Sequence, residues 1–208
     1  MSDSQPLTEA TEIYRRLEER AINDSNDLNR RVVACRRCRR RGAFLPVVGS
    51  GHPLADILLV KYQPHYLEVT EGVAFFGRSG AAILKSLERL GVNPLVVYGT
   101  NLLKCHDVRL TEAEKNCPLY WLEEFHLTHP RMMVVMGRQT VQAINKTRVA
   151  GMKRLSWDPG AIQTFTSRIV ASSTGSRWLK FRAFDFLSPV RLISTVLLPG
   201  GTTRLSSL

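Results

Sequence analysis

No apolar run in the sequence approaches about 18 residues, the length that a membrane-spanning helix needs. The first residues, Met1 to Pro6, are polar and lack the apolar stretch of a secretory signal peptide. Cysteine is scarce too, with four residues in 208. We therefore expect a cytoplasmic protein without membrane association, and in that reducing compartment cysteines are more often ligands or catalytic groups than disulfides.

The charge of the chain is unevenly spread along its length. Residues 1–27 carry seven acids against three arginines, whereas Arg30 to Arg41 holds seven arginines and no acid, and the net charge is +11. Such a block is an electrostatic footprint for phosphate, and a merely solvated charged face is the alternative interpretation. The arginines that flank the first cysteines are the candidate phosphate contacts: Arg36, Arg37, Arg39, Arg40 and Arg41.

Alternating strand and helix patterns run through most of the chain, whose length suits one compact domain. Short runs rich in Val, Ile and Leu predict buried strands at residues 55–60, 95–98 and 132–136, and a fourth can be placed at 191–198. Helical patterns cover residues 8–34, 79–90 and 111–127. This alternation predicts an α/β fold with a parallel sheet covered by helices. Residues 178–186 fit either a helix or an edge strand.

The four cysteines form the pattern Cys35-x-x-Cys38, Cys105 and Cys117. The first pair lies inside the arginine block, which a hydrophobic core would not accept, and thiolates beside so much positive charge are poised to bind metal. A zinc ribbon requires a second close pair, and the sequence lacks one. Four separated thiolates suit an iron-sulfur cluster as well as zinc, so the spacing predicts four metal ligands but does not identify the metal.

Several motifs occur in one order along the chain, and together they resemble the iron-sulfur, family 4 type of uracil-DNA glycosylases, in a divergent actinobacterial-like form. The resemblance covers roughly residues 28–140, and from about Phe165 onward we find none. The motifs are Cys35-x-x-Cys38, Gly72-Val73-Ala74-Phe75-Phe76-Gly77-Arg78-Ser79-Gly80, Gly99-Thr100-Asn101-Leu102-Leu103-Lys104-Cys105, Cys117 and Val134-Val135-Met136-Gly137.

The resemblance implies a three-layer α/β/α sandwich with a short central parallel sheet. It also implies that the four cysteines ligate a 4Fe-4S cluster, which leaves zinc as the minority alternative. Such an enzyme extrudes a nucleotide from the duplex, stacks the base on an aromatic ring and reads its edge. Phe75 matches the stacking position, and Asn101 matches an asparagine whose amide offers a donor and an acceptor side by side.

The catalytic motifs of the family are degenerate in this chain. The first, Gly-Glu-Ala-Pro-Gly, aligns with Lys61-Tyr62-Gln63-Pro64-His65, where only the proline is kept and no carboxylate is present. Candidates for the catalytic role are Gln63, His65 and Glu68. Lys61 or His65 could instead stabilise the departing anion or contact phosphate. The second motif, His-Pro-Ser, finds its best counterpart in Leu198-Pro199-Gly200, which lacks the histidine.

Taken together, the sequence predicts a uracil-DNA glycosylase-like repair protein that hydrolyses the N-glycosidic bond of uracil in DNA. Two alternatives stay open: a catalytically lapsed iron-sulfur module that only binds DNA, and a zinc-stabilised nucleic-acid adaptor unrelated to glycosylases. We expect a monomer, with Lys61 and the five arginines as its DNA contacts. The expected division is an acidic helical segment at 1–27, a glycosylase-like domain at 28–165 and a divergent segment at 166–208 that could complete the sheet.

Overall fold

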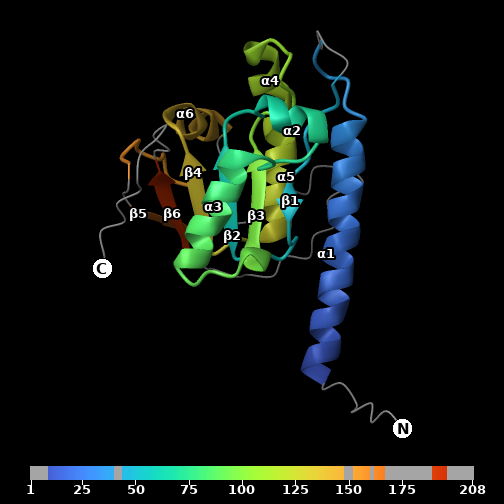
Figure 1. Cartoon of the computed structure of the whole chain (residues 1–208), viewed down its shortest axis with the longest axis vertical. Helices are drawn as coiled ribbons and strands as arrows, with labels where there is room; N and C mark the ends of the chain where they lie inside the picture. Colours follow the sequence, from blue (N-terminus) through green and yellow to red (C-terminus); the bar gives the residue numbers. More distant parts are fainter. Residues whose placement is uncertain (1–8, 40–43, 148–151, 160–161, 167–188, 196–208) are drawn as a thin grey trace.

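A six-stranded sheet forms the centre of the protein in a computed structural model that describes residues 9–39, 44–147, 152–159, 162–166 and 189–195 (Figure 1). The strand order is β1-β3-β2-β4-β6-β5, in which β3, β2, β4 and β6 are parallel, and β1 and β5 pair antiparallel at the two edges. The strands are β1 Ser50–Gly51, β2 Ile57–Lys61, β3 Val97–Asn101, β4 Met132–Met136, β5 Ile162–Thr166 and β6 Pro189–Thr195.

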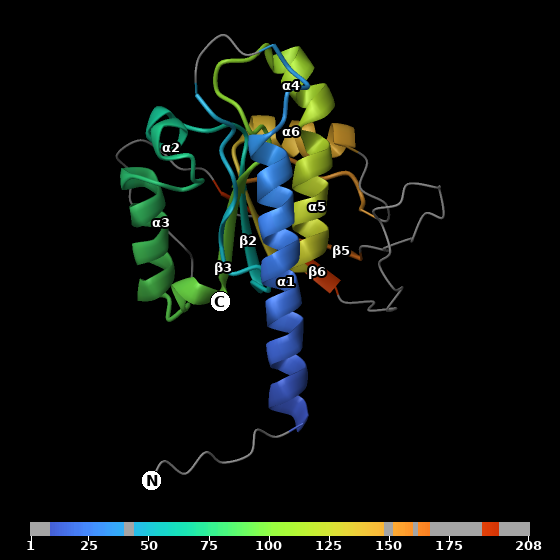
Figure 2. The same cartoon turned by 90° about the vertical axis from the view of Figure 1, so that its right-hand side faces the viewer.

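Helices cover both faces of this sheet, as Figure 2 shows. Ile83 and Leu87 of α3 pack on Leu59 and Val97 on one face. Helices α5 and α6 cover the opposite face, so the predicted three-layer α/β/α arrangement is confirmed. The helices are α1 Glu9–Val33, α2 Tyr66–Glu71, α3 Arg78–Arg89, α4 Leu110–Asn116, α5 Pro118–Thr128 and α6 Arg138–Thr147, with a 3-10 turn η1 at Pro94–Val96.

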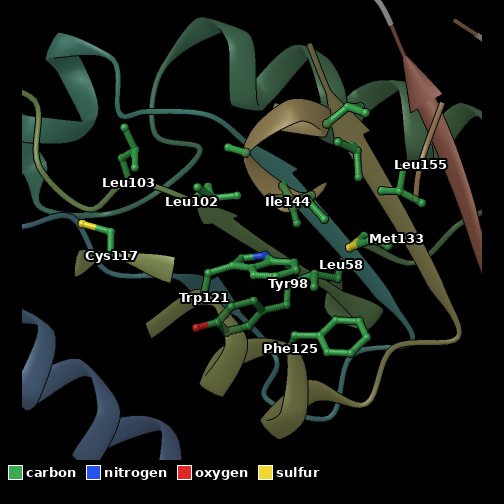
Figure 3. Close-up of a cluster of buried hydrophobic side chains, with 14 of the residues drawn as sticks. Leu58, Tyr98, Leu102, Leu103, Cys117, Trp121, Phe125, Met133, Ile144 and Leu155 are labelled. Atoms are coloured by element: carbon green, nitrogen blue, oxygen red, sulfur yellow. The ribbon is translucent and has the colours of Figure 1, made fainter. Parts of the chain in front are cut away.

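The main hydrophobic core lies between the sheet and α5 with α6 (Figure 3). Trp121 and Phe125 of α5 are stacked at a tilt, with ring centroids 5.9 Å apart, and they pack against Tyr98 of β3 and Met133 of β4. The apolar strands are buried on both faces because helices cover both sides, which is why they read as continuous Val, Ile and Leu runs in the sequence.

The predicted central strands and the first helix agree with the structure to within a few residues. The strand predicted at 95–98 begins only at Val97, because Asn93 caps a 3-10 turn that contains Pro94. The strand placed at 191–198 is β6, which begins at Pro189. The antiparallel strands β1 and β5 were not predicted, since neither has a long apolar run.

One helix predicted at 111–127 is two helices, and this prediction was wrong. Cys117 ends α4 and also caps the start of α5, so it lies between helices and not inside one. Pro118 is the reason, because proline has no N–H to continue the hydrogen bonds of α4 but suits the first position of a new helix. The Cys117 side chain is buried in the main hydrophobic core.

Helix α1 packs its second half against α5 and extends its first half beyond the body of the molecule (Figures 1 and 2). Leu28 and Val32 are buried against Tyr120, whereas Ile13 and Leu17 are more than half exposed. The helix crosses the expected boundary at residue 27 without interruption, and the division into domains stays a prediction. None of the described helices is long and apolar enough to cross a membrane.

Some predictions fall outside the described residues. They concern Arg40 and Arg41, the segment 178–186, the end of the strand placed at 191–198, and the counterpart of the second catalytic motif at 198–200.

Candidate functional site

The carboxyl ends of β2 and β3 lie side by side, and they present Lys61 and Asn101 as register partners at the ends of these parallel strands. Ligands of open α/β sheets bind in the crevice outside the carboxyl ends of the strands. Helix α2 and the end of α1 lie at this same end of the molecule (Figure 1). The topology therefore places the predicted base-reading residue where a ligand is expected.

Asn101 is buried at 1% exposure, and its amide has no hydrogen-bond partner among the residues that the structure describes. Both the oxygen and the nitrogen of the side chain lack a partner. A buried amide group left unsatisfied costs about 1–3 kcal/mol, so native structures rarely keep one without a reason. A ligand that offers one donor and one acceptor would satisfy both atoms of Asn101.

Phe75 packs its ring on β3 beside Asn101. A Cβ built at Gly99, two residues before Asn101, would lie 2.5 Å from a ring carbon of Phe75, so only glycine fits under the ring. Alternate residues of a strand face the same side, which puts the ring of Phe75 and the amide of Asn101 on one face of the sheet. A base stacked on the ring would thus have its edge near this amide.

The backbone of Phe75 is itself held in an unusual conformation, with φ at 61°. Positive φ is rare for a bulky residue and costs of order 1–3 kcal/mol, so it persists only where surrounding contacts impose it. One such contact is the close approach of α3, where a Cβ at Gly80 would overlap the Phe75 carbonyl oxygen at 1.6 Å. This close approach explains why residue 80, the last glycine of the motif that ends in Gly77-Arg78-Ser79-Gly80, has to be glycine.

Glu68 supplies the other contact that imposes this conformation. Its carboxylate is buried at 1% exposure and accepts hydrogen bonds from the backbone N–H of Phe75, from the Lys61 ammonium and, at 2.7 Å, from the backbone N–H of His65. The last of these caps the first turn of α2. Glu68 therefore ties together the end of β2, the start of α2 and the stacking residue, and this placement favours a positioning role.

The Lys61 ammonium lies over the ring of Phe75, 5.4 Å from its centroid. Its side chain is 22% exposed and pairs with the buried carboxylate of Glu68. Gln63 and His65, the other candidates from this loop, are exposed. The loop is also fixed from the other side, because the His106 Nδ1 lies 3.1 Å from the Pro64 carbonyl oxygen. The structure thus brings Lys61, Glu68, Phe75 and Asn101 together and leaves Gln63 and His65 at the surface.

The four cysteines come from three segments that meet where α1 ends and α5 begins. The Cys117 sulfur accepts from the backbone N–H of Lys104 at 3.5 Å, and the Cys38 sulfur accepts from the Asn116 amide at 3.3 Å. Burial raises the pKa of Cys117 to about 11, and the nearby Cys38 and Cys35 add to this rise. No three His, Cys, Asp or Glu side chains of the described segments are grouped closely enough to hold one metal ion. Metal ligation by the cysteines stays a prediction.

The described arginines of the basic segment lie beside Cys35 at the surface. Arg36, Arg37 and Arg39 are exposed, and the Arg37 guanidinium lies over the ring of Tyr120, 5.5 Å from its centroid. A surface pocket of about 420 Å³ is lined in part by Cys35 and Arg36. These exposed guanidinium groups are accessible to phosphate, at the end of the molecule that also carries α2.

A buried charge network beneath the site was missed in the sequence. The Lys104 ammonium contacts the Glu124 carboxylate at 2.6 Å and the Thr100 hydroxyl at 2.7 Å, and both charged side chains are almost fully buried. Thr100 precedes Asn101, and Lys104 precedes Cys105, so the network joins the two regions of interest. The sequence draws attention to Lys104 only through the motif that ends in Lys104-Cys105. Nothing near Glu124 in the sequence identifies it as the partner of Lys104.

A comparison with protein families agrees with this geometry. The family model described as Uracil DNA glycosylase superfamily matches residues 48–189, which is more than half of the chain. The chain belongs to the uracil DNA glycosylase superfamily. The resemblance predicted from the motifs is thereby confirmed. The superfamily match also extends past Phe165 to the start of β6, so the expectation of no resemblance in that part was wrong.

Individual members of the superfamily are similar to this chain at moderate sequence identity. The chain is 30% identical over 127 residues to the type-4 uracil-DNA glycosylase of Archaeoglobus fulgidus, covering 57% of this chain and 62% of that protein. It is 29% identical over 122 residues to the protein of the same name from Sulfurisphaera tokodaii, covering 54% of each. For the one from Saccharolobus solfataricus, identity is 25% over 143 residues, covering 64% and 65%. The chain therefore spans less than two thirds of the length of these relatives.

Proposed function

We propose that this protein is a uracil-DNA glycosylase, a repair enzyme that binds DNA and hydrolyses the bond between uracil and its deoxyribose. The observation that carries the proposal is Asn101, whose buried amide has no partner among the described side chains and backbone groups. Relatives named type-4 uracil-DNA glycosylase and membership of the superfamily support it.

The amide of Asn101 suits uracil and not cytosine. Its oxygen can accept from the N3–H of uracil while its nitrogen donates to O4. Cytosine presents an amino donor and an unprotonated ring nitrogen at these two positions, so one fixed amide cannot pair with it in the same way. The hydrogen bonds of the amide would thus select uracil over cytosine.

Phe75 would stack the extruded base, since its ring is held on the surface of β3 beside Asn101. Stacking of a base on an aromatic side chain contributes about 1–3 kcal/mol. The conformation imposed on Phe75 by Glu68 means that the ring is in place before a base arrives. Preorganisation of this kind reduces the entropy lost on binding.

The second candidate function is a DNA-binding module that has lost catalysis. It is favoured by the loop 61–65, which has no carboxylate, and by Glu68, whose carboxylate already accepts from three donors and so is poorly placed to activate water. Uracil recognition through Phe75 and Asn101 would be the same in both cases. The two functions differ only in whether the glycosidic bond breaks.

A 4Fe-4S cluster is the cofactor we propose, held by Cys35, Cys38, Cys105 and Cys117. The donor chemistry fits, because all four side chains are thiols outside disulfides and because N–H groups of Lys104 and Asn116 donate to two of the sulfur atoms. Such outer hydrogen bonds tune metal-bound thiolates. A bound cluster would crosslink the segment after α1, the loop after β3 and the start of α5. Zinc is the alternative.

The proposed function is tested by uracil release from single-stranded and duplex DNA carrying one uracil, with protein purified under anaerobic conditions. Binding of the same DNA is measured in parallel, and the Phe75→Ala and Asn101→Ala variants serve as pocket controls. Uracil release that both variants lose supports the enzyme. Uracil-dependent binding without release supports the lapsed module, and binding that ignores uracil would contradict both functions.

A further inference from the structure

The inference concerns Lys61, which takes the place of a glycine in the family motif Gly-Glu-Ala-Pro-Gly as it aligns with residues 61–65. Lys61 is the last residue of β2 and the register partner of Asn101 on β3. Register partners of parallel strands point to the same side of a sheet, so both side chains start from the same edge and the same face. The lysine therefore belongs to the base-reading region by its position.

The contacts of Lys61 point to a base and not to a phosphate. Its ammonium lies over the face of Phe75, the surface on which a base would stack, and pairs with the buried carboxylate of Glu68. The side chain is only 22% exposed. An ammonium has three N–H donors, and among the described residues the carboxylate of Glu68 accepts one of them. Donors are left for a carbonyl oxygen of a stacked uracil.

The reaction needs such a donor. Cleavage of the glycosidic bond leaves both electrons of the C1′–N1 bond on uracil, as an anion whose charge spreads to the carbonyl oxygens. A positioned cation in a site shielded from water stabilises such developing charge strongly. The resemblance implies a histidine donor to uracil in the family motif His-Pro-Ser, and Leu198-Pro199-Gly200 lacks that histidine.

We propose that Lys61 is a catalytic residue that donates a hydrogen bond to the departing uracil anion, and that Glu68 is a positioning residue that holds Lys61 against the stacking face; this inference rests on the proposed uracil-excising or uracil-binding function. In the reaction, the C1′–N1 bond breaks, a water oxygen bonds to C1′, and the proton lost by that water passes to solvent. The uracil anion takes up a proton from solvent when it is released, which balances the hydrolysis.

The lysine is suited to this task by its charge and by its flexible stem. In the free protein its ammonium rests on the ring and the carboxylate, and a stacked base would replace the ring contact with a contact to its own oxygen. Glu68 cannot follow the base, because its carboxylate is buried and also accepts from two backbone N–H groups. The Lys61 ammonium can thus move toward the base while the Glu68 carboxylate stays in place.

Leaving-group chemistry tests this role. Single-turnover release is measured on DNA with uracil or 5-fluorouracil at one position, using the full chain and the Lys61→Met, Lys61→Arg and Lys85→Met variants. Fluorine stabilises the anion, so a lost donor matters less for 5-fluorouracil. We expect Lys61→Met to slow uracil release roughly 100-fold and 5-fluorouracil release clearly less, with Lys61→Arg near the wild type.

The Lys85→Met variant controls for the loss of one positive charge, because Lys85 is exposed on α3. Equal losses on both bases would reduce Lys61 to a structural support of Phe75 and overturn the proposal.

A binding measurement decides the case of a protein that does not cleave. Affinities are measured for free uracil, which is neutral, and for 5-nitrouracil, whose ring is anionic at neutral pH. We expect the wild type to prefer the anion roughly 10- to 100-fold and Lys61→Met to lose that preference while still binding uracil. Equal affinity of the wild type for both bases would overturn the role of Lys61 but leave the uracil pocket standing. Failure to bind either base, with no uracil release, would overturn the proposed function and the inference with it.

Discussion

The ring of Phe75 rests directly on the backbone of Gly99, where an added Cβ would come within 2.5 Å of a ring carbon. Because the ring faces the sheet beside Asn101, this contact fixes the distance between the stacking surface and the base-reading amide. A methyl group at residue 99 would have to push the ring away, since backbone on one side and aromatic carbon on the other leave no space.

Gly99→Ala should therefore impair uracil recognition while leaving the cysteine region unchanged. We expect a loss of affinity for uracil-containing DNA comparable to that of Phe75→Ala, about 1–3 kcal/mol, measured by fluorescence anisotropy. The double variant should be little worse than either single change, because both remove the same stacking surface. Full additivity of the two losses would show that Gly99 acts independently of Phe75.

Cys117→Ser should remove the proposed cluster. Iron and sulfide content should fall in the purified protein, and the melting temperature should drop, because metal bound only by the folded state contributes to folding free energy. The matched control is Asn116→Ala, which removes a hydrogen bond to the Cys38 sulfur but no ligand and should keep its iron. A Cys117→Ser protein with unchanged colour and melting temperature would exclude Cys117 as a ligand.

Arg37→Ala combined with Arg39→Ala should weaken binding to DNA of any sequence. Each lost phosphate contact lowers the slope of log affinity against log salt by about 0.9 for duplex DNA. The control is Arg16→Ala with Arg20→Ala, which removes the same charge from exposed positions of α1 more than ten residues before Cys35. Identical salt slopes for the two double variants would make the segment a solvated charged face.

Lys104→Met should destabilise the fold by about 3–5 kcal/mol, because it leaves the carboxylate of Glu124 buried at 0% exposure without its cation. Urea unfolding measures the change. The double variant Lys104→Met, Glu124→Leu should recover a large part of the loss, since no unpaired charge is then buried. A double variant less stable than Lys104→Met would show that Glu124 contributes mainly through Thr100 and Tyr98, which also donate to it.

Acidification should destabilise the protein through His126. Burial lowers the pKa of His126 below its ordinary 6.5, the nearby His129 lowers it further, and Glu123 opposes the shift. The unfolded chain takes up a proton near pH 6.5 and the folded chain only at lower pH, so this stability is present above about pH 6.5 and is lost as the pH falls. Urea midpoints at pH 7.5 and 5.5 should differ less in His126→Gln than in the wild type. An equal difference in the two proteins would exclude His126 as the source of the acid sensitivity.

The local pattern of the sequence was enough for the central strands, for α1 and α3, for the three-layer fold and for the family. Each of these follows from features that neighbours along the chain carry: the apolar runs of β2 and β4, the helical spacing of α1, and the short glycine-rich and cysteine-containing motifs. Even the break at Cys117 had a local signal in Pro118, although the apolar pattern on either side concealed it.

Only the tertiary structure decided the roles of the charged residues. Glu68 is a catalytic candidate in the sequence, and the fold surrounds it with donors from Lys61, His65 and Phe75. Lys61 and Lys104 are the same type of residue, yet Lys61 lies over the ring of Phe75 near the surface and Lys104 is buried against Glu124. A charge can be buried only where a distant part of the chain supplies its partner, and local periodicity carries no information about that partner.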